Sequence, residues 1–158
     1  MYIDELSKRA NIKLWMLRRL KKLGASKEIL VDLYNKQIRS VLEYASPVWN
    51  PGLSKADVQD LERIQKAAFS IIFSNQNYQD TLKIHKQKSL EERRLHLSKK
   101  FADKAAKHAV FSSWFREKSV TISTRNKSKY VEVPFRTMKM KNSPIPAMTS
   151  ILNSKTNK

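Results

Sequence analysis

Apolar residues recur at steps of three and four through the first two thirds of the chain. This spacing places them on one face of an α-helix, as Leu6, Ala10 and Leu14 illustrate near the N-terminus. Polar and charged residues fill the positions between them, so each helix is expected to bury one face only. The pattern predicts helices over residues 3–23, 27–45, 55–73, 78–85 and 90–110.

Residues that suit a change of backbone direction separate these segments. The sequence SPVWNPG, residues 46–52, is predicted to be a loop because two prolines and a glycine interrupt regular structure there. Ser54 with Asp57, and Ser89 with Glu92, have the spacing of a capping box, in which two side chains satisfy free N–H groups at a helix start. Together these signals predict a mainly α fold, a bundle of about four main helices.

The character of the sequence changes after residue 115. Basic residues outnumber acidic ones there, and serine, threonine and β-branched residues are frequent. The sequence YVEV at 130–133 is suited to a strand, but an isolated strand has no partner to pair with. We therefore expect a helical domain over residues 1–115 and a basic, extended and weakly ordered tail over 116–158.

Composition limits the classes of function. The chain has 32 lysine and arginine residues against 14 aspartate and glutamate residues, a formal net charge of +18 that favours polyanionic partners, with nucleic acid foremost. Cysteine is absent, which excludes disulfides and zinc-thiolate sites, and the 2 glycines disfavour both all-β folds and Gly-rich phosphate loops. The charged N-terminus is unlike a secretory signal, and no segment is apolar for the length that a membrane span needs.

Residue patterns typical of catalysis or metal binding are missing. The histidines are His85, His96 and His108, and the last two stand about 18 Å apart on one predicted helix, too far to share a metal ion. The acidic pairs at positions 4–5 and 91–92 begin predicted helices, where negative charge favours the helix dipole. We therefore expect no enzyme activity of its own, no metal and no cofactor.

The basic residues are the candidate binding groups. Four lysines continue along the predicted helix 90–110 and form a basic stripe beside its apolar face. Of the arginine pair at its start, one fits an ion pair with a glutamate on its own helix and the other a contact to a phosphate; a solvated helix face is the alternative. The candidate nucleic-acid-binding residues are Arg93, Arg94, Lys99, Lys100, Lys104, Lys107, Arg125, Lys127, Lys129, Arg136, Lys139 and Lys141.

The three tryptophans are the candidate stacking groups. Trp15 lies beside the apolar face of the first predicted helix and is expected in the core. Trp49 stands between two prolines, where it either covers the junction of two helices or stacks on a base. Trp114 follows the fifth predicted helix and is expected to pack on its end.

Several separate segments together carry a family pattern. They are Tyr34, Ile38, Arg39, Leu42, Glu43, Tyr44, Pro47, Trp49, the run LERIQK at 61–66, the run LEERR at 90–94, and later SSWF and NSPIPAMTSILN. In order and spacing they resemble the C-terminal, thumb-side region that follows the palm in non-LTR retrotransposon reverse transcriptases. The resemblance covers about residues 3–152.

This resemblance implies a place in an RNA-directed DNA polymerase without its chemistry. The family's catalytic aspartates lie in a palm motif of the form aromatic-x-Asp-Asp, and this sequence has no match to it. The chain is therefore expected to be a non-catalytic segment that holds RNA, DNA or an RNA–DNA hybrid by phosphate contacts, with the polymerase palm as a further partner and no membrane.

Other interpretations stay open. The helices suit a protein-interaction module, or a non-functional remnant of a retroelement. A cationic helix at a membrane surface also fits part of the basic stripe, although the charge extends far beyond one face. Basic runs such as RRLKK are consistent with an intracellular location, nuclear or cytoplasmic.

Overall fold

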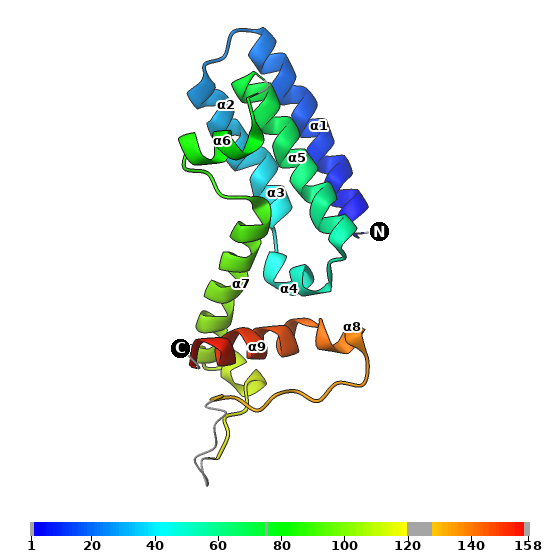
Figure 1. The fold of residues 1–158 in the computed structure, drawn as a ribbon, viewed down its shortest axis with the longest axis vertical. Helices are drawn as coiled ribbons and strands as arrows, with labels where there is room; N and C mark the ends of the chain where they lie inside the picture. Colours follow the sequence, from blue (N-terminus) through cyan, green and yellow to red (C-terminus); the bar gives the residue numbers. More distant parts are fainter. Residues whose placement is uncertain (1, 75, 120–127, 157–158) are drawn as a thin grey trace. The chain divides into compact units, whose positions relative to one another are not determined.

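The computed structural model describes residues 2–74, 76–119 and 128–156, and these are predominantly helical (Figure 1), which confirms the mainly α prediction. The chain divides into two compact units. The first comprises Met1–Tyr44 and Leu53–Arg93, and the second comprises Ala45–Gly52 and Arg94–Lys158. This division differs from the expected boundary after residue 115, because residues 94–115 pack with the C-terminal segment instead.

The first unit is built on two long helices that lie side by side, α1 (Tyr2–Lys22) and α5 (Lys55–Phe73) (Figure 1). Both have nearly the bounds that the sequence pattern predicts. The predicted inner face of α1 is buried, with Ala10 and Leu17 fully covered, and Leu61 and Ala68 of α5 are equally buried. Ser54 and Asp57 form the complete capping box, with each side chain bound to the other residue's backbone N–H.

The predicted helix 27–45 consists of three consecutive segments: α2 (Lys27–Leu33), the π-helical turn η1 (Tyr34–Arg39) and α3 (Ser40–Glu43). Its buried residues follow steps of four, namely Leu30, Tyr34, Ile38 and Leu42. Ile29, an apolar residue next to Leu30, is 57% exposed. In a π-helical turn each N–H binds the carbonyl five residues earlier, so the turn holds more residues than an α-helical turn. Residues four apart therefore stay on the buried side of this segment. The buried side lies one position away from the one that an uninterrupted α-helix would give.

Buried polar side chains connect the helices of the first unit. The Tyr34 hydroxyl donates to the Gln65 Oε1 at 2.6 Å, and the Gln65 Nε2 donates to the Tyr78 oxygen at 2.9 Å and to the Lys88 carbonyl at 3.0 Å. Tyr78, the first residue of α6 (Tyr78–Ile84), donates to Glu62. Burial raises the pKa of Tyr34 and of Tyr78, so both phenols stay protonated and act as donors.

The segment SPVWNPG, predicted to be a loop, is helical. It forms the short helix α4 (Ser46–Trp49) and the 3-10 turn η2 (Asn50–Gly52), so that prediction was wrong. Proline is favourable in the first turn of a helix, where its missing N–H would have no intrahelical acceptor, and Pro47 occupies such a position. Ala45, in the left-handed region with φ of 50°, turns the chain into α4.

The C-terminal segment is also more ordered than its composition indicated. Residues Pro144–Thr156 form α9, and Met148 and Leu152 on it are buried with Ala102 and Ala105 of α7 (Leu90–Lys107). The expectation of a weakly ordered tail was therefore wrong for α9. Its apolar residues recur at helical spacing, and the excess of basic residues before it hid that signal.

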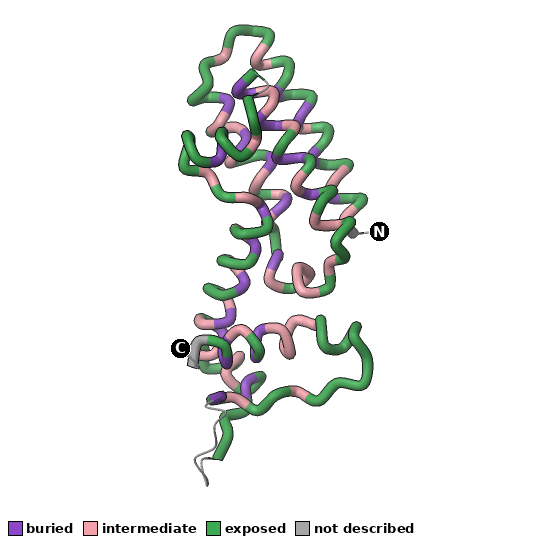
Figure 2. Tube along the Cα trace, viewed as in Figure 1, coloured by how far each residue is buried: buried purple, intermediate pink, exposed green. Residues whose placement is uncertain are grey.

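Between these helices, the second unit holds short and extended segments. They are η3 (Phe111–Trp114), α8 (Met138–Lys141) and an isolated antiparallel bridge between Glu117 and Tyr130. Asn153 of α9 binds both backbone groups of Tyr130 at 3.0 Å and fixes the start of the segment 130–133, which forms this single bridge and not the strand its sequence suited. Residues 134–142 are exposed throughout (Figure 2).

One of the tryptophans lies elsewhere than expected. Trp15 is 61% exposed, so the prediction that it belongs to the core was wrong. The buried face of α1 passes through Leu14 and Leu17, and position 15 points to the side of it. Trp114 is 41% exposed and packs on Phe111 at the end of α7, with 4.7 Å between ring centroids.

Candidate nucleic-acid interface

The basic stripe on α7 is present at the surface. Lys99, Lys100, Lys104 and Lys107 are all exposed, and the helix buries Ser98, Ala102 and Ala105 on its other side. Lys100, Lys104 and Lys107 follow steps of four and three and therefore share one face. The parallel row through Lys99 and Lys107 has Asp103 between them, so its charge is weaker. All four lysines belong to the second unit.

Arg93 is occupied by a carboxylate within the protein. Its guanidinium makes two hydrogen bonds to Glu43, one of them 2.9 Å long from Nη2 to Oε2, and these bonds raise the pKa of Arg93. Arg39 lies on the same carboxylate, with 3.7 Å between Nε and Oε1. The sequence predicted a glutamate partner on the same helix, but the partner comes from α3, fifty residues away in the sequence. Arg93 is therefore corrected from a phosphate ligand to a link between helices.

Arg94 is corrected as well, because it is fully buried. Its Nε donates to the Asn50 Oδ1 at 3.0 Å, and its guanidinium lies over the Trp49 ring, 5.9 Å from the centroid. An arginine in this position supports the turn η2 and cannot reach a phosphate at the surface. Trp49 is partly buried beneath it, which favours the interpretation of Trp49 as a structural cover over that of an open base-stacking platform.

The basic residues of the C-terminal segment differ in their surroundings. Lys129 pairs with Glu117 at 2.8 Å, which raises the pKa of Lys129, and it lies 5.3 Å from the Tyr130 ring centroid. Arg136 and Lys139 are exposed, and so is Lys141. Arg125 and Lys127 lie outside the described residues.

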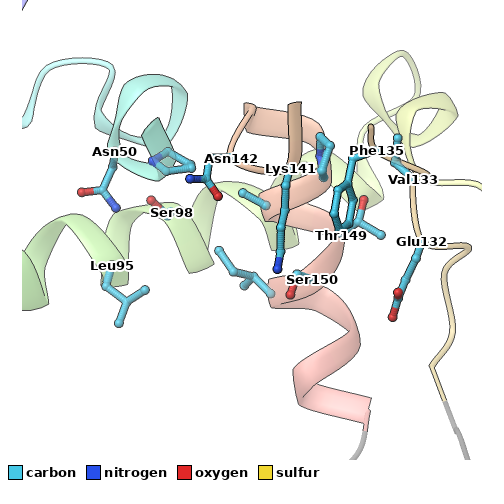
Figure 3. A pocket seen from close by; sticks show the side chains of 14 residues that line it. Asn50, Leu95, Ser98, Glu132, Val133, Phe135, Lys141, Asn142, Thr149 and Ser150 are labelled. Carbon is cyan, nitrogen blue, oxygen red and sulfur yellow. The ribbon is translucent and has the colours of Figure 1, made fainter. Parts of the chain in front are cut away.

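Lys141 lines a pocket of about 550 Å³ within the second unit (Figure 3). The walls also contain Leu95 and Ser98 of α7, Thr149 and Ser150 of α9, Asn50 of η2, and Glu132, Val133, Phe135 and Asn142. The Lys141 ammonium stands 5.3 Å from the centroid of the Phe135 ring, and Figure 3 shows the two side chains next to each other.

Sequence reasoning selected Lys141 but missed Phe135 and the remaining walls. A phenylalanine in a basic, proline-containing stretch was the available signal, since Phe135 has no helical or strand periodicity that would assign it to a core. The polar wall residues Ser98, Asn142 and Ser150 carry no motif that could have identified them.

Among the described residues, no group of three or more histidine, aspartate and glutamate side chains is arranged to hold a metal ion. Two histidines are engaged in ring stacking instead, His85 on Phe73 at 3.9 Å and His108 on Phe111 at 4.6 Å between centroids. None of the helices in the described ranges is long and apolar enough to cross a membrane.

Comparisons of the chain with protein-family models, with curated proteins and with solved structures find no match. The candidate interface therefore rests on two features of the structure: a row of exposed lysines on α7, and a pocket in which a lysine lies over an aromatic ring.

Proposed function

We propose that the chain binds RNA, DNA or an RNA–DNA hybrid through its lysines, as a non-catalytic, thumb-side segment of a non-LTR retrotransposon reverse transcriptase. The observation that carries the proposal is the exposed row of α7, where Lys100, Lys104 and Lys107 share a face opposite a buried one. Lysine ammonium groups bind phosphate as point charges and do not distinguish bases, so binding of this kind is largely independent of sequence.

The charge of the whole chain supports the same conclusion. A formal net charge of +18 on 158 residues attracts a polyanion over a long range and repels itself without one. The resemblance to reverse transcriptases supplies the setting, in which another part of the polymerase performs the chemistry and this segment holds the template or the primer duplex.

The salt dependence of affinity for a short RNA–DNA hybrid tests this proposal. Contacts to several phosphates give a log–log slope of about −4 or steeper, since each contact contributes roughly 0.9. Changing Lys99, Lys100, Lys104 and Lys107 together to glutamine is expected to flatten the slope by about two or more.

A matched control removes the same charge from the first unit, by changing the exposed Lys8, Lys27, Lys55 and Lys83 to glutamine. We expect it to retain most of the slope, because the contacts lie on α7. An equal loss in the two variants would show that α7 is not the contact surface. No binding by the wild-type chain at low salt would refute nucleic-acid binding itself.

A second candidate function is docking of a protein helix, and the exposed side of α1 favours it. Ile12 is 70% exposed, and Trp15 and Met16 beside it are also open to solvent. A groove of about 760 Å³ runs from Ile12 to Val41 and Tyr44. Apolar side chains gathered in this way on one helix are typical of protein-binding surfaces.

Charge defines the partner for this groove. Arg9 and Lys13 line it together with Glu5, and Glu5 already pairs with Arg9. The occupant that fits is an amphipathic helix with an apolar face and acidic flanks. Calorimetry with a designed acidic amphipathic helix and with its scrambled sequence tests this fit.

Ile12→Ser is expected to weaken binding of the designed helix, and Ile29→Ser provides the control because Ile29 is 57% exposed on α2 and outside the groove. Equal binding of the designed and scrambled peptides would count against docking, as would equal effects of the two substitutions.

A further inference from the structure

We infer that the pocket of the second unit holds one unpaired base of a nucleic acid strand, stacked on Phe135, with the adjoining phosphate on Lys141. This inference rests on the proposed function and adds a distinction to it: the α7 lysines bind any polyanion, whereas the pocket distinguishes single strands from duplex. The argument starts from the size of the pocket. Its volume of about 550 Å³ lies within the range of pockets that enclose small molecules, and a nucleotide is of that size.

The aromatic wall provides the stacking surface. Phe135 is 47% exposed although it is a large apolar side chain, and it stands in a segment that is exposed from 134 to 142 (Figure 2). Every base has a π face, so a phenylalanine ring at the wall of a pocket accepts any of them. Leu95 and Val133 add apolar surface to the lining of the pocket.

The Lys141 ammonium lies over the Phe135 ring, at a face on which a base would stack. It is 5.3 Å from the ring centroid, so a base that displaces it from this face leaves the ammonium next to the adjoining phosphate. Its long side chain is exposed and can turn from the ring to a phosphate oxygen without breaking a buried contact. Ring and cation together match the two chemically different halves of a nucleotide.

The rest of the lining argues against other anions. Neutral hydrogen-bonding groups of Asn50, Ser98, Asn142 and Ser150 suit the mixed donors and acceptors of a base edge. Glu132 also lines the pocket, and its carboxylate repels a compact, highly charged ligand such as free phosphate. A base edge, by contrast, offers N–H groups to that carboxylate. In a duplex the edges are paired and the faces stacked, so a paired base has neither available.

The experiment compares a short single strand with a blunt duplex of the same length. In the wild-type chain, a fluorescent adenine analogue within the strand should lose emission on binding, because stacking quenches it, whereas the analogue inside the duplex should not. Phe135→Leu is expected to lower affinity for the strand about tenfold and to leave affinity for the duplex within about twofold.

A second pair of variants distinguishes the contribution of the pocket to binding from that of positive charge in general. Lys141→Gln and Lys139→Gln remove the same charge from the same short helix, but only Lys141 lines the pocket. We expect the first to weaken strand binding about threefold more than the second. Equal effects, or an unchanged affinity in Phe135→Leu, would overturn the inference while leaving phosphate binding by α7 intact. Failure of the wild-type chain to bind either strand or duplex would refute the proposed function itself.

Discussion

Arg93 and Arg94 are neighbours in the sequence, yet they belong to different compact units and have different surroundings. In the first unit, Arg93 shares the Glu43 carboxylate with Arg39 and so connects α7 to α3. In the second, Arg94 is fully buried, donates a hydrogen bond to Asn50 and lies over the Trp49 ring. Two identical side chains serve as internal supports by different chemistry, one by ion pairing and one by packing on an aromatic ring.

The two units also differ in how they use polar groups. The first has a continuous buried network from Tyr34 through Gln65 to Tyr78 and Glu62, and Glu62 also accepts from the Leu90 N–H at 3.1 Å at the start of α7. The second has a smaller apolar core around Met148 and displays the α7 lysines to solvent. The first unit therefore connects its helices through buried hydrogen bonds, whereas the core of the second around Met148 is apolar.

The largest expected effects come from the two cores. Leu61→Ala in the first unit should lower the free energy of unfolding by about 3 kcal/mol, and Met148→Ala in the second by about 2 to 3 kcal/mol, because each leaves a cavity. Leu23→Ala, at a position that is 80% exposed, should change stability by less than about 0.5 kcal/mol.

Amide hydrogen exchange shows whether the units are energetically distinct. Leu61→Ala should reduce protection in α5 while α9 retains it, and Met148→Ala should do the reverse. Equal loss of protection in both units, in both variants, would show a single cooperative structure and remove the basis of the comparison.

The next largest effect concerns the paired arginine. Glu43→Gln should lower the free energy of unfolding by about 2 kcal/mol, because Arg93 and Arg39 are largely covered and lose the carboxylate that compensates their burial. Urea unfolding measures the loss. Glu5→Gln is the control, since Glu5 and Arg9 form an exposed pair, and it should cost less than about 0.5 kcal/mol. A similar loss in both variants would show that the buried position of Glu43 adds nothing.

Helices with a regular apolar period were predictable from the sequence. α1 and α5 have almost the predicted bounds, and the capping box of Ser54 and Asp57 has the predicted partners, because these features depend on neighbours within a few residues. α9 is shorter, has a weaker apolar period and follows a basic stretch whose composition indicated an extended tail.

Contacts between distant residues could not be predicted in the same way. The partner of Arg93 comes from α3, and the burial of Arg94 depends on how Asn50 and Trp49 are folded in a segment that was predicted to be a loop. The same limit applies to the candidate site: the α7 lysines follow from helical spacing, whereas the pocket gathers Leu95, Phe135 and Ser150 from three separate segments. The spacing of residues along a sequence does not determine which distant segments come into contact.

The smallest expected effects on stability concern the N-terminal caps of two helices, one in each unit. In the first unit, the Ser54 hydroxyl accepts from the Asp57 N–H at 3.2 Å, and Asp57 binds back to Ser54. In the second, Thr137 accepts from the Met140 N–H at 3.2 Å without a carboxylate in return. Ser54→Ala should lower the stability of α5 by about 1 kcal/mol, and Thr137→Ala should lower that of α8 by less.

Only the first of these effects should depend on pH. Hydrogen bonds from Ser54 lower the pKa of Asp57, so the ionised carboxylate stabilises the folded chain above about pH 4 and this contribution is lost as pH falls through the lowered pKa. Ser54→Ala should therefore cost more at neutral pH than in acid, whereas Thr137→Ala should cost the same at both. Hydrogen exchange in α5 and α8 at two pH values measures the difference. A pH-independent loss in Ser54→Ala would mean that the hydroxyl alone, without the carboxylate, stabilises the start of α5.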